Sequence, residues 1–130
     1  MPNLNFISQF EGNLGIPIHA REFASALEKK INVNRIQIGG SFKSIGGPGL
    51  IFWYPQSYTD YNVFQKTIGY YIFEYTKIPK QFIEQINTLD GICTASKWGK
   101  KVLMDNGVLV PIYVVRGGIN PEKFNTSNIR

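Results

Sequence analysis

Two glycines placed between an apolar segment and a helical segment are the first residues whose spacing suggests chemistry. Gly12 and Gly15 follow the alternating segment 3–10 and precede apolar residues that recur at helical intervals. In a strand–turn–helix unit, backbone N–H groups at the start of the helix can bind a phosphate. The residues Gly12, Asn13, Leu14 and Gly15 are therefore the candidate phosphate loop. Two glycines do not complete the GxGxxG pattern, and a plain tight turn explains them equally well.

Polar or glycine residues also end three later apolar runs. The three runs are 69–73, 91–94 and 111–115. They are followed by Glu74, by Ser96 and by the pair Gly117-Gly118, respectively. Strands that alternate with helices at this interval predict a parallel sheet with crossover helices. In such a sheet the carboxyl ends of the strands lie along one edge, where ligands bind. We expect these residues to share that edge.

Several of these residues also have simpler explanations. Ser96 is well placed to cap a helix, and no Ser-His-Asp arrangement surrounds it. Glu74 fits a solvated carboxylate, and Trp98 fits a core position. His19 fits a surface or capping residue, and Cys93, inside an apolar run, fits a buried and unreactive thiol. With one histidine and one cysteine, we expect no metal site.

The elements that would position these residues form an α/β domain. We expect a Rossmann-like three-layer sandwich with a six-stranded, mostly parallel sheet in the order 3-2-1-4-5-6. The predicted strands are 3–10, 35–39, 50–54, 67–73, 92–94 and 110–115. The predicted helices begin at Pro17, at Pro79 and after Ser96. We expect loops at 40–49 and 56–65, and a turn at 120–124.

Composition limits the class of protein. The chain has 130 residues, of which 43% are hydrophobic and 18% charged, and this favours one globular domain over disorder. The single cysteine and the lack of a long apolar run indicate a cytoplasmic protein without a membrane span. The net charge of +5 would suit phosphates or an anionic membrane surface, although a solvated basic face explains it more simply. The basic residues are dispersed, so we expect no nucleic acid partner.

The order of several short motifs resembles the amino-terminal half of glycosyltransferase family 4, enzymes of the GT-B fold. In the family a strand ends near an aromatic-Glu pair, and a proline-initiated helix, a serine-opened helix and a Gly-(Val/Ile)-(Asp/Asn)-Pro-x-x-Phe signature follow. Similar residues occur here in the same order: Phe73-Glu74, Pro79, Asp90, Ser96, Gly107-Val108, 111–115, Gly118-Ile119-Asn120-Pro121 and Phe124. The front also resembles the family, with Gly12-x-x-Gly15 before the helical segment 19–27. Asn120 stands where the family more often has Asp, and the segment between the first helix and Gly69 is short for the family.

The resemblance implies the acceptor-side half of a retaining glycosyltransferase. Residues 1–124 would be one domain, and 125–130 would begin an interdomain linker or tail. In the family a second domain holds most of the nucleotide-sugar donor, so this chain would need that domain or a separate donor-binding chain for activity. The expected partners are a nucleotide-sugar donor and a glycan acceptor, with no further cofactor. A homo-oligomer and a membrane surface remain open.

The resemblance also suggests a role for each candidate residue. The loop from Gly12 to Gly15 would face the donor phosphates. Aromatic rings and carboxylates would hold the acceptor sugar, and the residues expected on the acceptor-side rim are Tyr70, Tyr71, Glu74, Ser96 and Trp98. The interdomain rim would consist of Arg116, Gly117 and Gly118. Two alternatives remain: a non-catalytic module that binds a glycan or a protein, and a small nucleotide-binding regulator.

Overall fold

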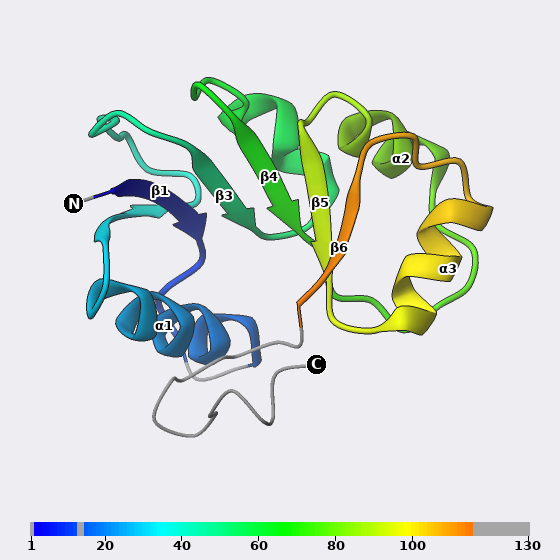
Figure 1. Cartoon of the computed structure of the whole chain (residues 1–130), viewed down its shortest axis with the longest axis horizontal. Coiled ribbons are helices and arrows are strands. Elements are labelled where there is room, and N and C mark those ends of the chain that lie inside the picture. Colours follow the sequence, from blue (N-terminus) through cyan, green and yellow to red (C-terminus); the bar gives the residue numbers. More distant parts are fainter. Residues whose placement is uncertain (1, 13–14, 116–130) are drawn as a thin grey trace.

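The computed structural model describes residues 2–12 and 15–115, which form an α/β domain around one parallel sheet (Figure 1). The strands are β1 (Asn3–Ser8), β2 (Asn32–Gln37), β3 (Gly49–Phe52), β4 (Thr67–Tyr70), β5 (Gly91–Thr94) and β6 (Ile112–Val114). The helices are α1 (Gly15–Glu28), the 3-10 helix η1 (Pro55–Tyr61), α2 (Lys80–Ile86) and α3 (Lys97–Asp105). All neighbouring strands pair in parallel, so the predicted Rossmann-like class is confirmed.

Apolar side chains cover both faces of the sheet, as expected for a parallel sheet. Because successive side chains of a strand point to opposite faces, Phe6 and Phe52 pack on α1, whereas their neighbours Ile7 and Ile51 pack on the other face. On the first face, Phe23 of α1 completes an aromatic cluster with its two strand partners. The second face carries η1, α2 and α3 (Figure 1). The domain is therefore a three-layer sandwich.

The strand order differs from the prediction in one place. The sheet runs β2-β1-β3-β4-β5-β6, so β3 lies between β1 and β4, and β2 forms the outer edge. The prediction of 3-2-1-4-5-6, which put β3 outermost, is wrong in this respect. Composition explains the result, since β2 reads NVNRIQ and suits an edge, whereas three of the four residues of β3 are buried.

A buried asparagine directs the chain to this position of β3. The side chain of Asn5 is fully buried, and its Oδ1 accepts hydrogen bonds from the backbone N–H of Ile45 and from Asn34. Its Nδ2 donates to the backbone carbonyl oxygens of Gly46, at 3.0 Å, and Pro48, at 3.3 Å. These bonds hold the loop between β2 and β3 beside the amino end of β1. The loop thereby carries β3 to the far side of β1.

The other predicted elements are present with shifted ends. β1, β3, β4 and β6 are shorter than expected, and the segment after Pro55, predicted to be a loop, contains η1. The expected turn at 120–124, the expected tail at 125–130 and the interdomain rim residues Arg116, Gly117 and Gly118 lie outside the described residues. In the described part of the chain, no helix is both long and apolar enough to cross a membrane.

Candidate functional site

A cleft opens at the carboxyl edge of the sheet, between the turn after β1 and the segment that follows β3. Its volume is about 480 Å³. The residues that line it are Gln9, Glu11, Gly12, Gly15, Ile16, Pro17, Trp53 and Tyr54. It therefore lies where parallel α/β sheets bind their ligands. It includes both described glycines of the predicted phosphate loop, whereas Asn13 and Leu14 lie outside the described residues.

The turn at the mouth of the cleft is held by an arginine of α1. Gly12 has a φ of +110°, a conformation that side chains with a Cβ rarely adopt. The guanidinium group of Arg21 donates hydrogen bonds to the carbonyl oxygens of Phe10, at 2.8 Å, and Gly12, at 2.7 Å. Charge-assisted bonds of this kind are stronger than neutral ones. The arginine therefore fixes the turn, and those two bonds direct its Nη1 atom to the backbone.

The opposite wall consists of two adjacent aromatic residues. The ring centroids of Trp53 and Tyr54 are 5.1 Å apart in an edge-to-face arrangement, and Tyr54 is 39% exposed. The buried Tyr58 of η1 donates a hydrogen bond from its hydroxyl to the carbonyl oxygen of Trp53, at 3.1 Å. Pro55 begins η1 directly after the pair. Both aromatic residues therefore stand on a supported backbone.

The electrostatic character of the cleft is mildly acidic. Glu11 is exposed, and its backbone N–H donates to Oε1 of Gln9 at 3.2 Å. No lysine, arginine or histidine is among the described residues that line the cleft. Oε1 of Gln9 also accepts a hydrogen bond from the side-chain amide of Gln37, so the carboxylate of Glu11 is the main acceptor that this wall offers to a ligand. A carboxylate suits the hydroxyls of a neutral ligand better than the charge of a phosphate.

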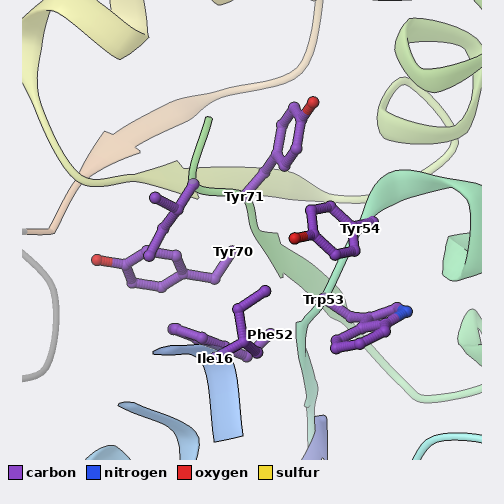
Figure 2. Close-up of a pocket in the computed structure, with 7 residues that line it drawn as sticks. Ile16, Phe52, Trp53, Tyr54, Tyr70 and Tyr71 are labelled. Atoms are coloured by element: carbon purple, nitrogen blue, oxygen red, sulfur yellow. The ribbon is translucent and has the colours of Figure 1, made fainter. Parts of the chain in front are cut away.

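Tyr70 and Tyr71 are core residues and not an exposed platform. They are 2% and 1% exposed, and they line a cavity of only about 10 Å³ beside the cleft. Figure 2 shows Trp53 and Tyr54 to the right of this cavity and Tyr70 to its left. Burial raises the pKa of both tyrosines. The resemblance implied that these two rings lie on the acceptor-side rim. Because they are buried, they are not available to stack on a sugar.

The hydroxyls of these two tyrosines bond within the domain. The hydroxyl of Tyr70 donates to the carbonyl oxygen of Val115. The hydroxyl of Tyr71 pairs with that of Tyr75, which is 43% exposed. Tyr71 therefore connects the buried core to the surface of the loop between β4 and α2.

The remaining rim residues lie around the start of α3. Ser96 caps this helix, because its hydroxyl accepts a hydrogen bond from the N–H of Gly99 at 3.0 Å, as predicted. Trp98 is 45% exposed, so the alternative that places it in the core is wrong. Its ring lies 5.7 Å from that of Phe73, and Glu74 is exposed to solvent. Trp98 and Glu74 are thus accessible, whereas Ser96 has a structural task.

The lone cysteine and histidine do not join the cleft. Cys93 is partly buried in β5, and burial raises the pKa of its thiol to about 11, which makes it unreactive at neutral pH. His19 is exposed on α1. Within residues 2–12 and 15–115, no three His, Cys, Asp or Glu side chains come together as metal ligands.

Sequence reasoning missed Trp53 and Tyr54, the most prominent residues of the cleft. They stand at the end of the apolar run LIFWY, which the sequence predicts to be the strand 50–54. The available signal was Pro55, which ends the strand and therefore places the residues just before it at the carboxyl edge. The same rule that selected Glu74 would have selected this aromatic pair.

Comparisons with protein-family models, with curated proteins and with solved structures found no match to this chain. The confirmed Rossmann-like fold is compatible with many activities, so any functional conclusion has to come from the cleft itself.

Proposed function

We propose that this domain binds a sugar in its carboxyl-edge cleft and serves as the acceptor-side half of a sugar-transferring enzyme of the GT-B type. The observation that supports the proposal is the composition of the cleft. It places two aromatic rings, Trp53 and Tyr54, opposite the turn that carries Glu11 and Gln9.

Each part of the cleft suits a part of a sugar. The C–H faces of a pyranose are apolar and pack on aromatic rings, whose flat faces carry partial negative charge. Sugar hydroxyls donate to carboxylates and exchange hydrogen bonds with amides. A volume of about 480 Å³ is within the usual range of small-molecule sites. Trp53 would provide the stacking surface, and Glu11 would accept a hydrogen bond from a hydroxyl.

The proposed role in transfer follows from this geometry. In the transfer step, the acceptor oxygen forms a bond to the anomeric carbon of the donor sugar, the nucleoside diphosphate leaves with the bonding electrons, and the proton of the acceptor hydroxyl passes to an oxygen of the departing diphosphate. Glu11 would orient the acceptor hydroxyl, and the N-terminus of α1 at Gly15 could stabilise negative charge on the leaving group. Because the described lining residues include no cation, a second, donor-binding unit would hold most of the diphosphate.

Calorimetric titration of the purified chain with monosaccharides, oligosaccharides and nucleotide sugars tests this proposal. We expect sugar binding that Trp53→Ala weakens about 10-fold or more, a loss of about 1.4 kcal/mol. Tyr113→Ala is the matched control, since Tyr113 is 49% exposed on β6 and is not among the residues that line the cleft. Failure of every sugar to bind, or equal loss in both variants, would contradict the proposal.

A non-catalytic glycan-binding module is the second candidate. The absence of a cation from the described lining residues favours it, because such a module has no leaving diphosphate to stabilise. The same titrations separate the two candidates. Affinity for a nucleotide sugar above that for the free sugar supports the transferase half, whereas sugar binding without any contribution from the nucleotide supports the module.

A further inference from the structure

We infer that β6 forms an interface with a second copy of this chain, by antiparallel pairing of the two β6 strands about a two-fold axis at Tyr113. β6 is the last strand at one end of the sheet, and among the described residues it pairs only with β5 (Figure 1). An outer strand of this kind offers unpaired backbone groups to another chain. The inference goes beyond the proposed function and does not depend on it, because the described residues that line the cleft belong to other segments.

Two hydrogen bonds show which backbone groups of β6 are directed to β5. The N–H of Ile92 donates to the carbonyl oxygen of Pro111 at 3.0 Å, and the N–H of Val115 donates to the carbonyl oxygen of Thr94 at 2.8 Å. Because residues along a strand direct their backbone groups to alternate sides, Tyr113, which lies between Pro111 and Val115, also faces β5. The two residues that separate these three therefore direct their backbone groups away from β5.

The outer side of β6 is complementary to a second copy of itself. Its free groups are the N–H and carbonyl groups of Ile112 and Val114, which lie symmetrically about Tyr113. In an antiparallel pair, Ile112 of each copy would exchange two hydrogen bonds with Val114 of the other, so that every outward group is satisfied. The two Tyr113 side chains would then lie directly opposite each other, in the kind of pair whose side chains approach most closely. In the single chain, this ring lies against Gly91 of β5 and is 49% exposed.

The segment around β6 is apolar and lacks the charges that usually protect an outer strand. Residues 108–115 read VLVPIYVV, and Leu109 is 86% exposed. β2, at the other end of the sheet, carries Arg35, which forms an ion pair with Glu28 at 2.7 Å. Charged side chains of this kind prevent outer strands from pairing with other chains, and exposed apolar segments mark interfaces. Two copies can therefore meet at residues 108–115 without bringing like charges of this segment together.

A second copy fits β6 better than the segment that follows it in the same chain. Residues 116–130 come directly after β6, and a hairpin with Gly117-Gly118 as its two-residue turn would put Pro121 opposite Val114. Proline has no N–H to donate to the outward carbonyl oxygen of Val114. A second β6 strand provides this donor. Because the other end of the sheet is protected, the two-fold pairing closes at two copies and does not extend into a fibre.

Sedimentation velocity of the full chain over a series of concentrations tests the inference. We expect the mass to rise with concentration toward twice the 14.7 kDa of one chain, and no further. Tyr113→Lys places two like charges opposite each other and should weaken the dimer about 10-fold or more, whereas Tyr113→Phe should retain it. Met104→Lys is the matched control, because it adds the same charge at an exposed residue of α3. It should change the dissociation constant by less than about 2-fold.

Amide hydrogen exchange, followed by NMR for each residue of the unmodified chain, tests the strand pairing itself. The N–H groups of Tyr113 and Val115 face β5 and should exchange slowly at every concentration. Those of Ile112 and Val114 should exchange slowly only at concentrations at which the dimer forms. A chain that stays monomeric, a dimer without this protection, growth beyond two copies, or equal weakening by the two lysine variants would overturn the inference. Circular dichroism establishes that the lysine variants are folded.

Discussion

The two edges of the sheet treat their polar and aromatic groups in opposite ways. At the amino edge, four asparagines of β1 and β2 bond to one another and to the backbone of the following loop. Asn32 donates to Asn3 at 3.1 Å, and Asn34 donates to Asn5 at 3.0 Å and to the carbonyl oxygen of Lys43 at 2.6 Å. The amides of this edge are therefore used to hold the protein together.

The carboxyl edge instead leaves a carboxylate and two aromatic side chains open to solvent. Glu11, Tyr54 and Trp98 are all exposed there, and the first two line the cleft of about 480 Å³. Its supporting bonds come from behind, through Arg21 and Tyr58. The two edges therefore differ: side-chain amides hold the loop after β2 at the amino edge, whereas exposed carboxylate and aromatic side chains border a cleft at the carboxyl edge.

The largest expected effect is at the amino edge. Asn5→Ala removes a fully buried amide and leaves the N–H of Ile45 and the carbonyl of Gly46 without that partner. Because unsatisfied buried groups are costly, we expect the free energy of unfolding to fall by about 3 kcal/mol. Urea denaturation measures it. Asn32→Ala, at an exposed member of the same ladder, should change it by less than about 0.5 kcal/mol. Similar losses of stability in both variants would refute the expected difference between the buried Asn5 and the exposed Asn32.

A smaller effect is expected at the turn that borders the cleft. Gly12→Ala introduces a Cβ at a φ of +110°, so we expect a loss of about 1–2 kcal/mol and weaker sugar binding. Gly15→Ala is the matched control, because it lines the same cleft without a positive φ and its Cβ would contact nothing within 4 Å. Thermal denaturation and calorimetry measure the two effects. If both variants behave alike, backbone strain at Gly12 does not shape the cleft.

The smallest expected effect is a pH dependence of stability that comes from Cys93, a partly buried residue of β5. The pKa of Cys93 is raised by burial from 9.0 to about 11, so the folded state favours the neutral thiol. Its contribution to stability is complete below pH 9 and is lost as the pH rises toward 11. We expect the difference in unfolding free energy between the wild type and Cys93→Ala to change by about 1 kcal/mol between pH 7, where the contribution of the neutral thiol is complete, and pH 10, where part of it is lost. Denaturation curves at several pH values measure this change. A difference that does not vary with pH would mean that the thiol is exposed to solvent in the folded protein.

Much of the fold could be predicted from local patterns. The six strands, the helices predicted to begin at Pro17, at Pro79 and after Ser96, and the Ser96 cap follow from apolar periodicity and from terminal residues. The position of β3 could not be predicted in this way, because it depends on hydrogen bonds between Asn5 and a loop about 40 residues later. Such contacts leave no periodic signal in the sequence.

The candidate site was only partly predictable for a similar reason. The rule for parallel sheets selected the edge at which the cleft opens, and Gly12 and Gly15 line this cleft. Whether an aromatic side chain at that edge points outward or inward depends on what packs against it. Tyr70 and Tyr71 are enclosed by neighbouring elements, whereas Tyr54 and Trp98 are not.

The sequence by itself determined the parallel α/β architecture and the edge of the sheet at which the cleft opens, because strand and helix periodicities and chain direction are local properties. Only the tertiary structure decided the strand order and which rings are exposed. Both depend on contacts between residues distant in the chain, and the free energy of those contacts exists only once the elements are packed together.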